Sequence, residues 1–280
     1  MVFTQPPQKS HRGQKINKSP IQGISETLNI DYRTPKTLKD NCVEYEFLKE
    51  LNADLAIVCA YGQIIPENFL NLTKKGFVNI HASILPRWRG AAPIQRSIMN
   101  LDTETGISIM RIKKELDTGP VSNIYKIKID QNQNAQEISE KLSALAAEKI
   151  LDNVDDILED KAKFIDQDHS KATYAKKIDK SEARINWKDS AKNIIGKINA
   201  LNPNPGTWFK LNDSRIKIIK ALEVRKKGKP GEILSQNFTI ACADNAIQIL
   251  ELKKEGKKEM KAFEFVKGHN LIIGKILTNE

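Results

Sequence analysis

The chain has 280 residues, of which 40% are hydrophobic and 29% are charged, and it carries a formal net charge of +10. This composition is typical of a globular protein, and the length favours about two domains. No apolar run approaches the roughly 18 residues that a membrane helix needs, so we expect no membrane partner. The cysteines Cys42, Cys59 and Cys242 show no metal-ligand spacing. They indicate reduced thiols in a cytoplasmic protein that has no metal site.

The positive charge is distributed unevenly along the chain. Residues 1–40 hold 7 basic and 3 acidic residues, residues 41–179 hold 18 and 21, and residues 180–280 hold 20 and 11. Basic ends around a near-neutral centre indicate that the two ends contact one polyanionic partner. For the C-terminal part alone, an equally good interpretation is that its lysines only keep the protein in solution.

The first predicted element is a basic loop at residues 4–20, where prolines and a glycine interrupt regular structure. Its basic residues are Lys9, Arg12, Lys15 and Lys18. Such a loop is either an exposed linker or a nucleic-acid contact. Helical spacing follows at residues 35–53. The apolar run at residues 54–60 is short enough to be a buried parallel strand.

The next strand is predicted at residues 77–80 and carries two polar residues at its C-terminal end. Asn79 and His81 lie two positions apart, so their side chains point to the same face of the strand. In open α/β sheets, ligands bind at this end of the strands. The run Ser83-Ile84-Leu85-Pro86 then forms a loop that the proline stiffens. A helix is predicted to begin at Gly90.

The remainder of the first domain is predicted as two strands and a long helix. The strands cover residues 103–113 and 121–129, and the loop between them carries Asp117. Apolar residues at helical spacing then predict a helix over residues 134–160 that closes the domain.

The C-terminal third is predicted as a small β-barrel. Short β-like runs lie at residues 216–222, 231–234, 238–243, 246–252 and 271–277. Trp187 and Trp208 could stack on nucleic-acid bases, but the interpretation that both belong to the core is favoured.

These motifs together resemble the folate-dependent formyltransferases. The resemblance rests on the Asn79-x-His81 pair, the loop Ser83 to Pro86, and Asp117 within Leu116-Asp117-Thr118-Gly119. The run RWRGAAPIQ at residues 87–95 is the most specific match, and it is similar to the members that act on charged initiator tRNA. The resemblance implies an α/β, Rossmann-like formyltransferase domain with a mostly parallel sheet, followed by a small OB-like β-barrel. The implied domains are residues 1–165, a linker at 166–179, and a tRNA-binding domain at 180–280.

The resemblance also implies the reaction and its partners. A formyl group would pass from 10-formyltetrahydrofolate to the α-amino group of initiator methionyl-tRNA, on a monomeric enzyme. The loop residues Ser83, Ile84, Leu85 and Pro86 would hold the folate through backbone groups. The basic loop would insert into the acceptor stem of the tRNA, with Arg12, Lys15 and Lys18 as its contacts.

Formyl transfer to an amine explains why an amide, an imidazole and a carboxylate would be needed together. Asn79 would donate its amide N–H to the developing oxyanion, which contributes about 3 kcal/mol in comparable sites. His81 would donate to the same oxygen or move the proton of the amine. Asp117 would orient His81, raise its basicity, or hold a water molecule that relays the proton.

Two alternatives stay open at this point. One is formylation of a sugar-nucleotide amine, against which the basic loop and the basic C-terminal part argue, because a small substrate needs neither. The other is a tRNA-binding remnant without catalysis. Compared with the family, about 30 residues that form an N-terminal strand and helix are expected to be absent, which would open an edge of the sheet.

Overall fold

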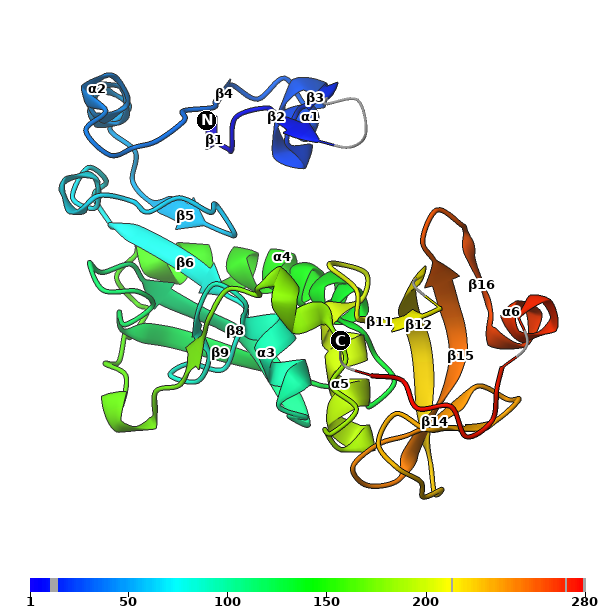
Figure 1. Cartoon of the computed structure of the whole chain (residues 1–280). Coiled ribbons are helices and arrows are strands. Elements are labelled where there is room, and N and C mark those ends of the chain that lie inside the picture. The colour runs from blue at the N-terminus through cyan, green and yellow to red at the C-terminus, as the bar shows by residue number, and fades with distance from the viewer. Residues whose placement is uncertain (11–14, 213, 270, 279–280) are drawn as a thin grey trace. The chain divides into compact units, whose positions relative to one another are not determined.

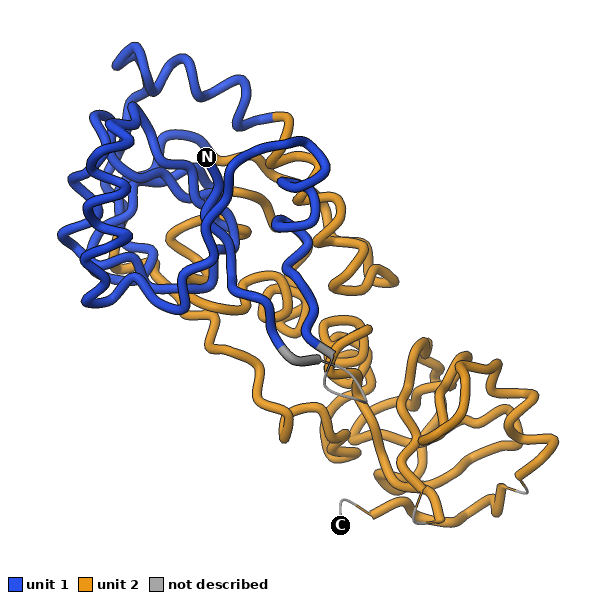
Figure 2. Tube along the Cα trace, turned by 90° about the horizontal axis from the view of Figure 1, so that it is seen from above, with its two compact units in different colours: residues 1–81, 108–123, 149–167 blue, residues 82–107, 124–148, 168–280 orange. Residues whose placement is uncertain are grey.

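The computed structural model describes residues 1–10, 15–212, 214–269 and 271–278. The chain forms two compact units, which Figure 2 shows in different colours. Unit 1 consists of residues 1–81, 108–123 and 149–167, and unit 2 consists of residues 82–107, 124–148 and 168–280. The division into domains at 166 and 180 stays a prediction, because the compact units follow spatial contacts and not the boundaries of the resemblance.

Unit 1 begins with short strands and two helices (Figure 1). These elements are β1 (Val2–Phe3), β2 (Gln8–Ser10), β3 (Lys15–Asn17), α1 (Pro20–Thr27), β4 (Tyr32–Arg33) and α2 (Cys42–Glu50). Strands β2 and β3 pair as an antiparallel hairpin around residues 11–14, which lie outside the described residues. The predicted basic loop is therefore, in its described part, a hairpin followed by a helix that begins at Pro20.

The central sheet has the order β5-β6-β8-β9, and β6 lies between β5 and β8 (Figure 1). Its strands are β5 (Ala56–Val58), β6 (Phe77–His81), β8 (Glu104–Arg111) and β9 (Val121–Lys128). Strand β6 runs parallel to β5 and antiparallel to β8. The 3-10 helix η1 (Glu67–Phe69) precedes β6, and the long helix α4 (Ala135–Leu158) follows β9. A core around Leu38, Leu48, Phe69 and Phe77 supports this sheet from inside unit 1.

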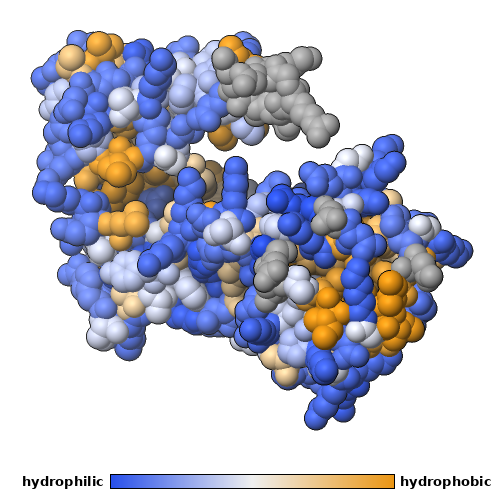
Figure 3. All heavy atoms as spheres, viewed as in Figure 1, coloured by the Kyte–Doolittle hydropathy of each residue, from blue (hydrophilic) through white to orange (hydrophobic). Residues whose placement is uncertain are grey.

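Strands β1 and β4 pair with each other in a parallel sheet of their own. Among the described residues, β5 pairs only with β6, so the outer edge of β5 is open. Ile57 on β5 is 46% exposed, and apolar side chains gather on the surface beside β5 and β6 (Figure 3). The β1–β4 pair is therefore separate from the sheet that begins with β5, where the resemblance implies a single, mostly parallel sheet.

Unit 2 begins with a short helix and a two-stranded sheet. Strand β7 (Arg89–Gly90) pairs in parallel with β10 (Tyr174–Ala175), and helix α3 (Pro93–Met99) follows β7. The predicted helix thus begins at Pro93 and not at Gly90. The reason is that the backbone of Arg89 to Ala92 bonds to Thr173 and Ala175 on β10 and its approach.

The C-terminal part of unit 2 is a curled antiparallel sheet with two helices (Figure 1). Its strands are β11 (Trp208–Leu211), β12 (Ser214–Val224), β13 (Ile233–Ser235), β14 (Thr239–Ala241), β15 (Ala246–Lys254) and β16 (Glu259–Lys261). Its helices are α5 (Ala191–Leu201) and α6 (Ala262–Gly268), and the 3-10 helices η2 (His169–Lys171) and η3 (Lys180–Ala183) lead into it. This arrangement confirms the predicted α/β fold with a small β-barrel-like domain.

The C-terminal prediction is wrong at residues 271–277, at α6 and at Trp208, and it is correct at Trp187. The run 271–277 forms only an isolated bridge from Ile276 to Glu232, while α6 takes a segment for which no helix was predicted. Trp187 is 1% exposed and belongs to the core, as predicted. Trp208 is only half-buried, because Phe209 and Leu211 occupy the inner face of β11 and leave Trp208 on the outer face.

Helix α3 is fixed to the segment that follows β10. Arg96 on α3 forms an ion pair with Glu182 at 2.6 Å and donates hydrogen bonds to the carbonyl oxygens of Lys176 and Lys177. Glu182 also caps η3, and the Arg96 guanidinium lowers the pKa of its carboxyl group. Helix α3 also packs against α5. The segment around residues 176–182 is therefore held along its length.

Two features are absent from the described residues. No helix there has the length and apolar composition that crossing a membrane requires. In the same part of the chain, no three His, Cys, Asp or Glu side chains come together in a group that could hold a metal ion.

Candidate active site

Strand β6 presents Asn79 and His81 from the middle of the central sheet. Asn79 lies opposite Val58 on β5 and Met110 on β8, and His81 lies opposite Ser108. The apolar, β-branched sequence of this strand suits a position between two neighbours. His81 is only 6% exposed, which places its imidazole in a site from which most water is excluded.

Asp117 reaches His81 from the loop between β8 and β9. The distance from Asp117 Oδ2 to His81 Nδ1 is 3.6 Å, and the two side chains are 12% and 7% exposed. This separation is longer than a direct hydrogen bond and brings the carboxylate beside the imidazole. The structure thus brings together two of the three predicted catalytic residues, which lie 36 positions apart in the sequence, and it places Asn79 two positions before His81 on the same strand.

The loop that carries Asp117 has a tightly constrained backbone. Asp117 has a φ of +53°, in the left-handed region that an aspartate tolerates better than most residues. A Cβ on Gly119 would lie 1.9 Å from the carbonyl oxygen of Arg111, so only glycine fits there. The predicted Leu-Asp-Thr-Gly motif therefore has a structural requirement at its glycine.

The predicted folate loop belongs to unit 2 and is folded by its own side chains. Ser83 is fully buried, and its hydroxyl donates a hydrogen bond to the carbonyl oxygen of Arg87 at 2.6 Å. The Arg87 N–H bonds to the carbonyl oxygen of Ile84, and Leu85 is 4% exposed. The Ser83 hydroxyl is thus used inside the loop, and the predicted folate contacts of this loop stay a prediction.

Asp102 holds the residues that follow this loop, a role that the sequence analysis missed. Its carboxylate accepts hydrogen bonds from the Arg87 guanidinium at 2.9 and 3.0 Å, from Trp88 Nε1 at 2.8 Å and from Asn100 Nδ2 at 2.7 Å. Trp88 itself has a φ of +61°, a conformation that is strained for a bulky residue. Asp102 therefore fixes Arg87 and Trp88 against the end of α3.

We expect Asp102→Asn to lower the free energy of unfolding by about 2 kcal/mol, because the amide turns one acceptor into a donor that faces other donors. The Arg87 contact contributes little to this figure, since that side chain is 45% exposed. Urea unfolding followed by far-UV circular dichroism measures the change. Asp130→Asn, an exposed substitution in the same unit, is the control and should stay within about 0.5 kcal/mol of the parent. Equal stabilities of the two variants would contradict this role of Asp102.

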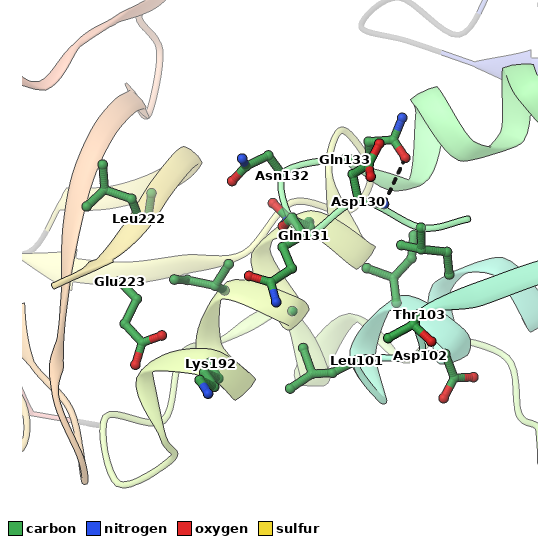
Figure 4. A pocket seen from close by; sticks show the side chains of 16 residues that line it. Leu101, Asp102, Thr103, Asp130, Gln131, Asn132, Gln133, Lys192, Leu222 and Glu223 are labelled. Atoms are coloured by element: carbon green, nitrogen blue, oxygen red, sulfur yellow. Dashed lines mark hydrogen bonds between the residues drawn. The ribbon is translucent and has the colours of Figure 1, made fainter. Parts of the chain in front are cut away.

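A cavity of about 170 Å³ lies elsewhere in unit 2 (Figure 4). It is bordered by the turn after α3, the segment before α4, helix α5 and strand β12. Apolar residues such as Leu101 and Leu222 and polar residues such as Lys192 and Glu223 line it. None of the predicted catalytic or folate-binding residues is among those that line it.

The predicted tRNA contacts fall partly outside the described residues. Arg12 lies in the undescribed segment 11–14, and Lys15 is the first residue of β3. Lys18 forms an ion pair with Glu26 at 2.7 Å, and this contact raises the pKa of Lys18 and lowers that of Glu26 to about 2. Lys18 is therefore paired within unit 1 in this structure, and a contact with tRNA would compete with Glu26.

The chain thus has an α/β part that carries Asn79, His81 and Asp117, followed by a small antiparallel β-domain. The sequence model of the formyl transferase family matches residues 1–154, and the model described as the formyl transferase C-terminal domain matches residues 177–270. The chain belongs to the formyl transferase family. It is 60% identical to methionyl-tRNA formyltransferase of Pelagibacter ubique (strain HTCC1062) over 279 residues, which cover 99% of this chain and 90% of that protein.

Solved structures share the fold at low sequence identity. A sugar 3N-formyl transferase, WlaRD, solved in the presence of dTDP and 5-N-formyl-THF, superposes with a TM-score of 0.66 at 22% identity over 92% of this chain and 88% of that one. HypX from Aquifex aeolicus, in complex with tetrahydrofolic acid, superposes with a TM-score of 0.64 at 18% identity. The match covers 95% of this chain but only 46% of HypX, so it concerns one part of that longer protein.

Proposed function

We propose that the chain transfers the formyl group of 10-formyltetrahydrofolate to the α-amino group of initiator methionyl-tRNA. The observation that carries this proposal is the contact between the buried His81 and the half-buried Asp117 at the end of β6, in a chain that is 60% identical to a methionyl-tRNA formyltransferase. A formylated folate is the formyl donor in this proposal because proteins with this fold are solved with tetrahydrofolic acid or with 5-N-formyl-THF.

The roles of the site residues follow from the charge that develops during transfer. The amine attacks the formyl carbon, and the formyl oxygen becomes an oxyanion that the Asn79 amide stabilises. His81 removes the proton that the attacking nitrogen loses, and Asp117 stabilises the imidazolium that results. Expulsion of the folate nitrogen, which takes up a proton, then completes the transfer. Ser83 to Pro86 contact the folate through backbone groups.

The test is formyl transfer from 10-formyltetrahydrofolate to charged initiator tRNA, measured beside transfer to a sugar-nucleotide amine. We expect transfer to the tRNA only. Transfer to the sugar nucleotide alone would overturn the substrate assignment. Binding of tRNA without any transfer would favour the alternative of a non-catalytic tRNA-binding protein.

A second part of the proposal concerns the surface that holds the tRNA. The outer face of the C-terminal sheet carries Trp208, whose ring stacks with the guanidinium groups of Arg215 at 3.9 Å and Arg184 at 5.4 Å from the ring centroid. Lys217 pairs across the strands with both Trp208 and Lys253. Burial and the neighbouring charges of Lys253 and Arg215 lower the pKa of Lys217. A phosphate group would relieve this crowding of positive charge, which is why we assign the face to the RNA backbone.

We expect Arg215→Gln to weaken tRNA binding by about threefold to tenfold and to reduce the slope of log K against log salt by about 1. The rate at saturating tRNA should not change, because Arg215 takes no part in the chemistry. Lys49→Gln on α2, which removes one exposed charge elsewhere, is the matched control. An unchanged salt slope in Arg215→Gln would remove this face from the proposed tRNA-binding surface.

The proposed enzyme is a cytoplasmic monomer that inserts its N-terminal hairpin into the acceptor stem of the tRNA. Support for the location comes from the cysteines, which are all free thiols. Burial raises the pKa of Cys242 to about 12, so this thiol is unreactive at neutral pH. For the hairpin, the contacts proposed are Arg12, Lys15 and Lys18, with the last released from Glu26.

A further inference from the structure

Gln167 is a buried residue at the end of unit 1 that holds the loop of Asp117. The residue as a whole is 8% exposed, and its side-chain amide nitrogen donates two hydrogen bonds. One goes to the carbonyl oxygen of Asp117 at 2.9 Å and the other to that of Gly119 at 2.7 Å. Both N–H groups of one planar amide are thus directed at the backbone of the motif that carries the proposed catalytic carboxylate.

The position of this contact matters because the loop contains a residue in a backbone conformation that is unfavourable without support. Asp117 has a positive φ, and residues held in such conformations persist only where their surroundings fix them. The Asp117 carbonyl belongs to the same residue as the carboxylate that lies 3.6 Å from His81. A change in the backbone orientation at Asp117 would therefore move the carboxylate relative to the imidazole.

The base of the loop is secured without Gln167. The Arg111 N–H bonds to the carbonyl oxygen of Pro120 at 2.9 Å, and Val121 and Ile165 exchange two backbone hydrogen bonds at 2.9 Å. The Ser122 hydroxyl also donates to the carbonyl oxygen of Ile109. Loss of the Gln167 amide would therefore loosen the tip of the loop while the strands on either side stay paired.

We propose that Gln167 is a positioning residue that keeps the Asp117 carboxylate in register with His81. The inference rests on the proposed function, because it gives Gln167 a task only if Asp117 acts in formyl transfer. Gln167 acts through the backbone of Asp117 and needs no contact with either substrate. Its removal should therefore lower the rate of the chemical step and leave substrate binding almost unchanged.

The first test uses Gln167→Met, which keeps the unbranched shape and loses both donors, and Gln167→Glu, which sets a carboxylate against two carbonyl oxygens. We expect kcat to fall by about tenfold in Gln167→Met and further in Gln167→Glu, with the KM values for folate and tRNA within twofold of the parent. The control is Asn153→Leu, which removes another buried amide of unit 1 that donates to a backbone carbonyl. It should change the melting temperature but not kcat. Equal falls in kcat and in substrate affinity, or losses of kcat in the control as large as in Gln167→Met, would overturn the proposal.

The deciding test is the double variant Gln167→Met with Asp117→Asn, in single-turnover assays that extend the measurable range. If Gln167 acts through Asp117, the double variant should be within threefold of Asp117→Asn alone. A further tenfold loss would show that Gln167 acts independently and would overturn the inference. The parent chain is assayed first, because absence of transfer by the parent refutes the proposed function, whereas a parent-like rate in Gln167→Met refutes only the role of Gln167.

Discussion

Asp117→Asn is expected to lower kcat for formyl transfer by about 10²- to 10³-fold while the KM values for both substrates stay within about threefold. The substitution keeps the size of the side chain and removes the negative charge that faces His81 Nδ1 at 3.6 Å. An imidazole that takes the proton from the amine becomes positively charged, and without the carboxylate that charge develops unpaired in a buried site. Steady-state kinetics with purified charged initiator tRNA measure the effect.

The matched control for this prediction is Asp166→Asn. Asp166 also lies in unit 1 and also forms an ion pair of 3.6 Å, with Lys113 Nζ, but its side chain is 83% exposed. Loss of such an exposed pair should leave kcat within twofold of the parent, because water screens it. If Asp117→Asn weakened tRNA binding as much as it slowed turnover, Asp117 would be a binding residue and not a catalytic one.

The second large effect is expected at Asn79. Asn79→Asp keeps the shape of the side chain but replaces the N–H donor by an oxygen that repels a developing oxyanion. We expect kcat to fall by about 10³-fold, which matches or exceeds the loss of one oxyanion donor in other acyl-transfer enzymes. Rapid-quench measurement of a single turnover isolates the chemical step, and fluorescence binding of the folate checks that the donor site stays occupied.

A comparison with Asn79→Ser separates two explanations of that loss. Serine retains a hydroxyl donor on a shorter side chain, so it should recover part of the rate if the amide works by donating a hydrogen bond. A higher rate in Asn79→Asp than in Asn79→Ser would instead indicate that Asn79 serves to shape the strand end, because aspartate keeps the shape of the side chain and serine does not.

The strand that carries Asn79 and His81 could be predicted from the sequence because its signals are local. The apolar run before Asn79 predicts a buried strand, and the period of two residues places Asn79 and His81 on one face. Strand β6 at Phe77–His81 confirms the predicted strand almost residue for residue. Asp117 could be identified from its motif. The sequence spacing together with the family resemblance suggests that it approaches His81.

Gln167 and Asp102 could not be found in this way, because their partners are defined only by the folded chain. Gln167 lies in a polar segment, 50 positions from the carbonyl that it holds. Nothing in that segment distinguishes a buried glutamine from an exposed one. Trp208 is different, because the alternation that places it on the outer face is present in the sequence. The general preference of tryptophan for the core outweighs that signal in the prediction. In the run Trp-Phe-Lys-Leu, the alternation assigns Trp208 to the same face as Lys210, and that is the exposed face.

The Arg96 contacts have a consequence for how the chain can be divided. Arg96 lies in the part matched by the first family model, and its partners Lys177 and Glu182 lie in the part matched by the C-terminal one. Helices α3 and α5 join the same two parts by packing. A cut near residue 176 would leave the Arg96 guanidinium and an apolar face of α5 without their partners. The region matched by the C-terminal model is therefore not a separable module, and a fusion or domain exchange designed at this boundary would need α3 on the same piece.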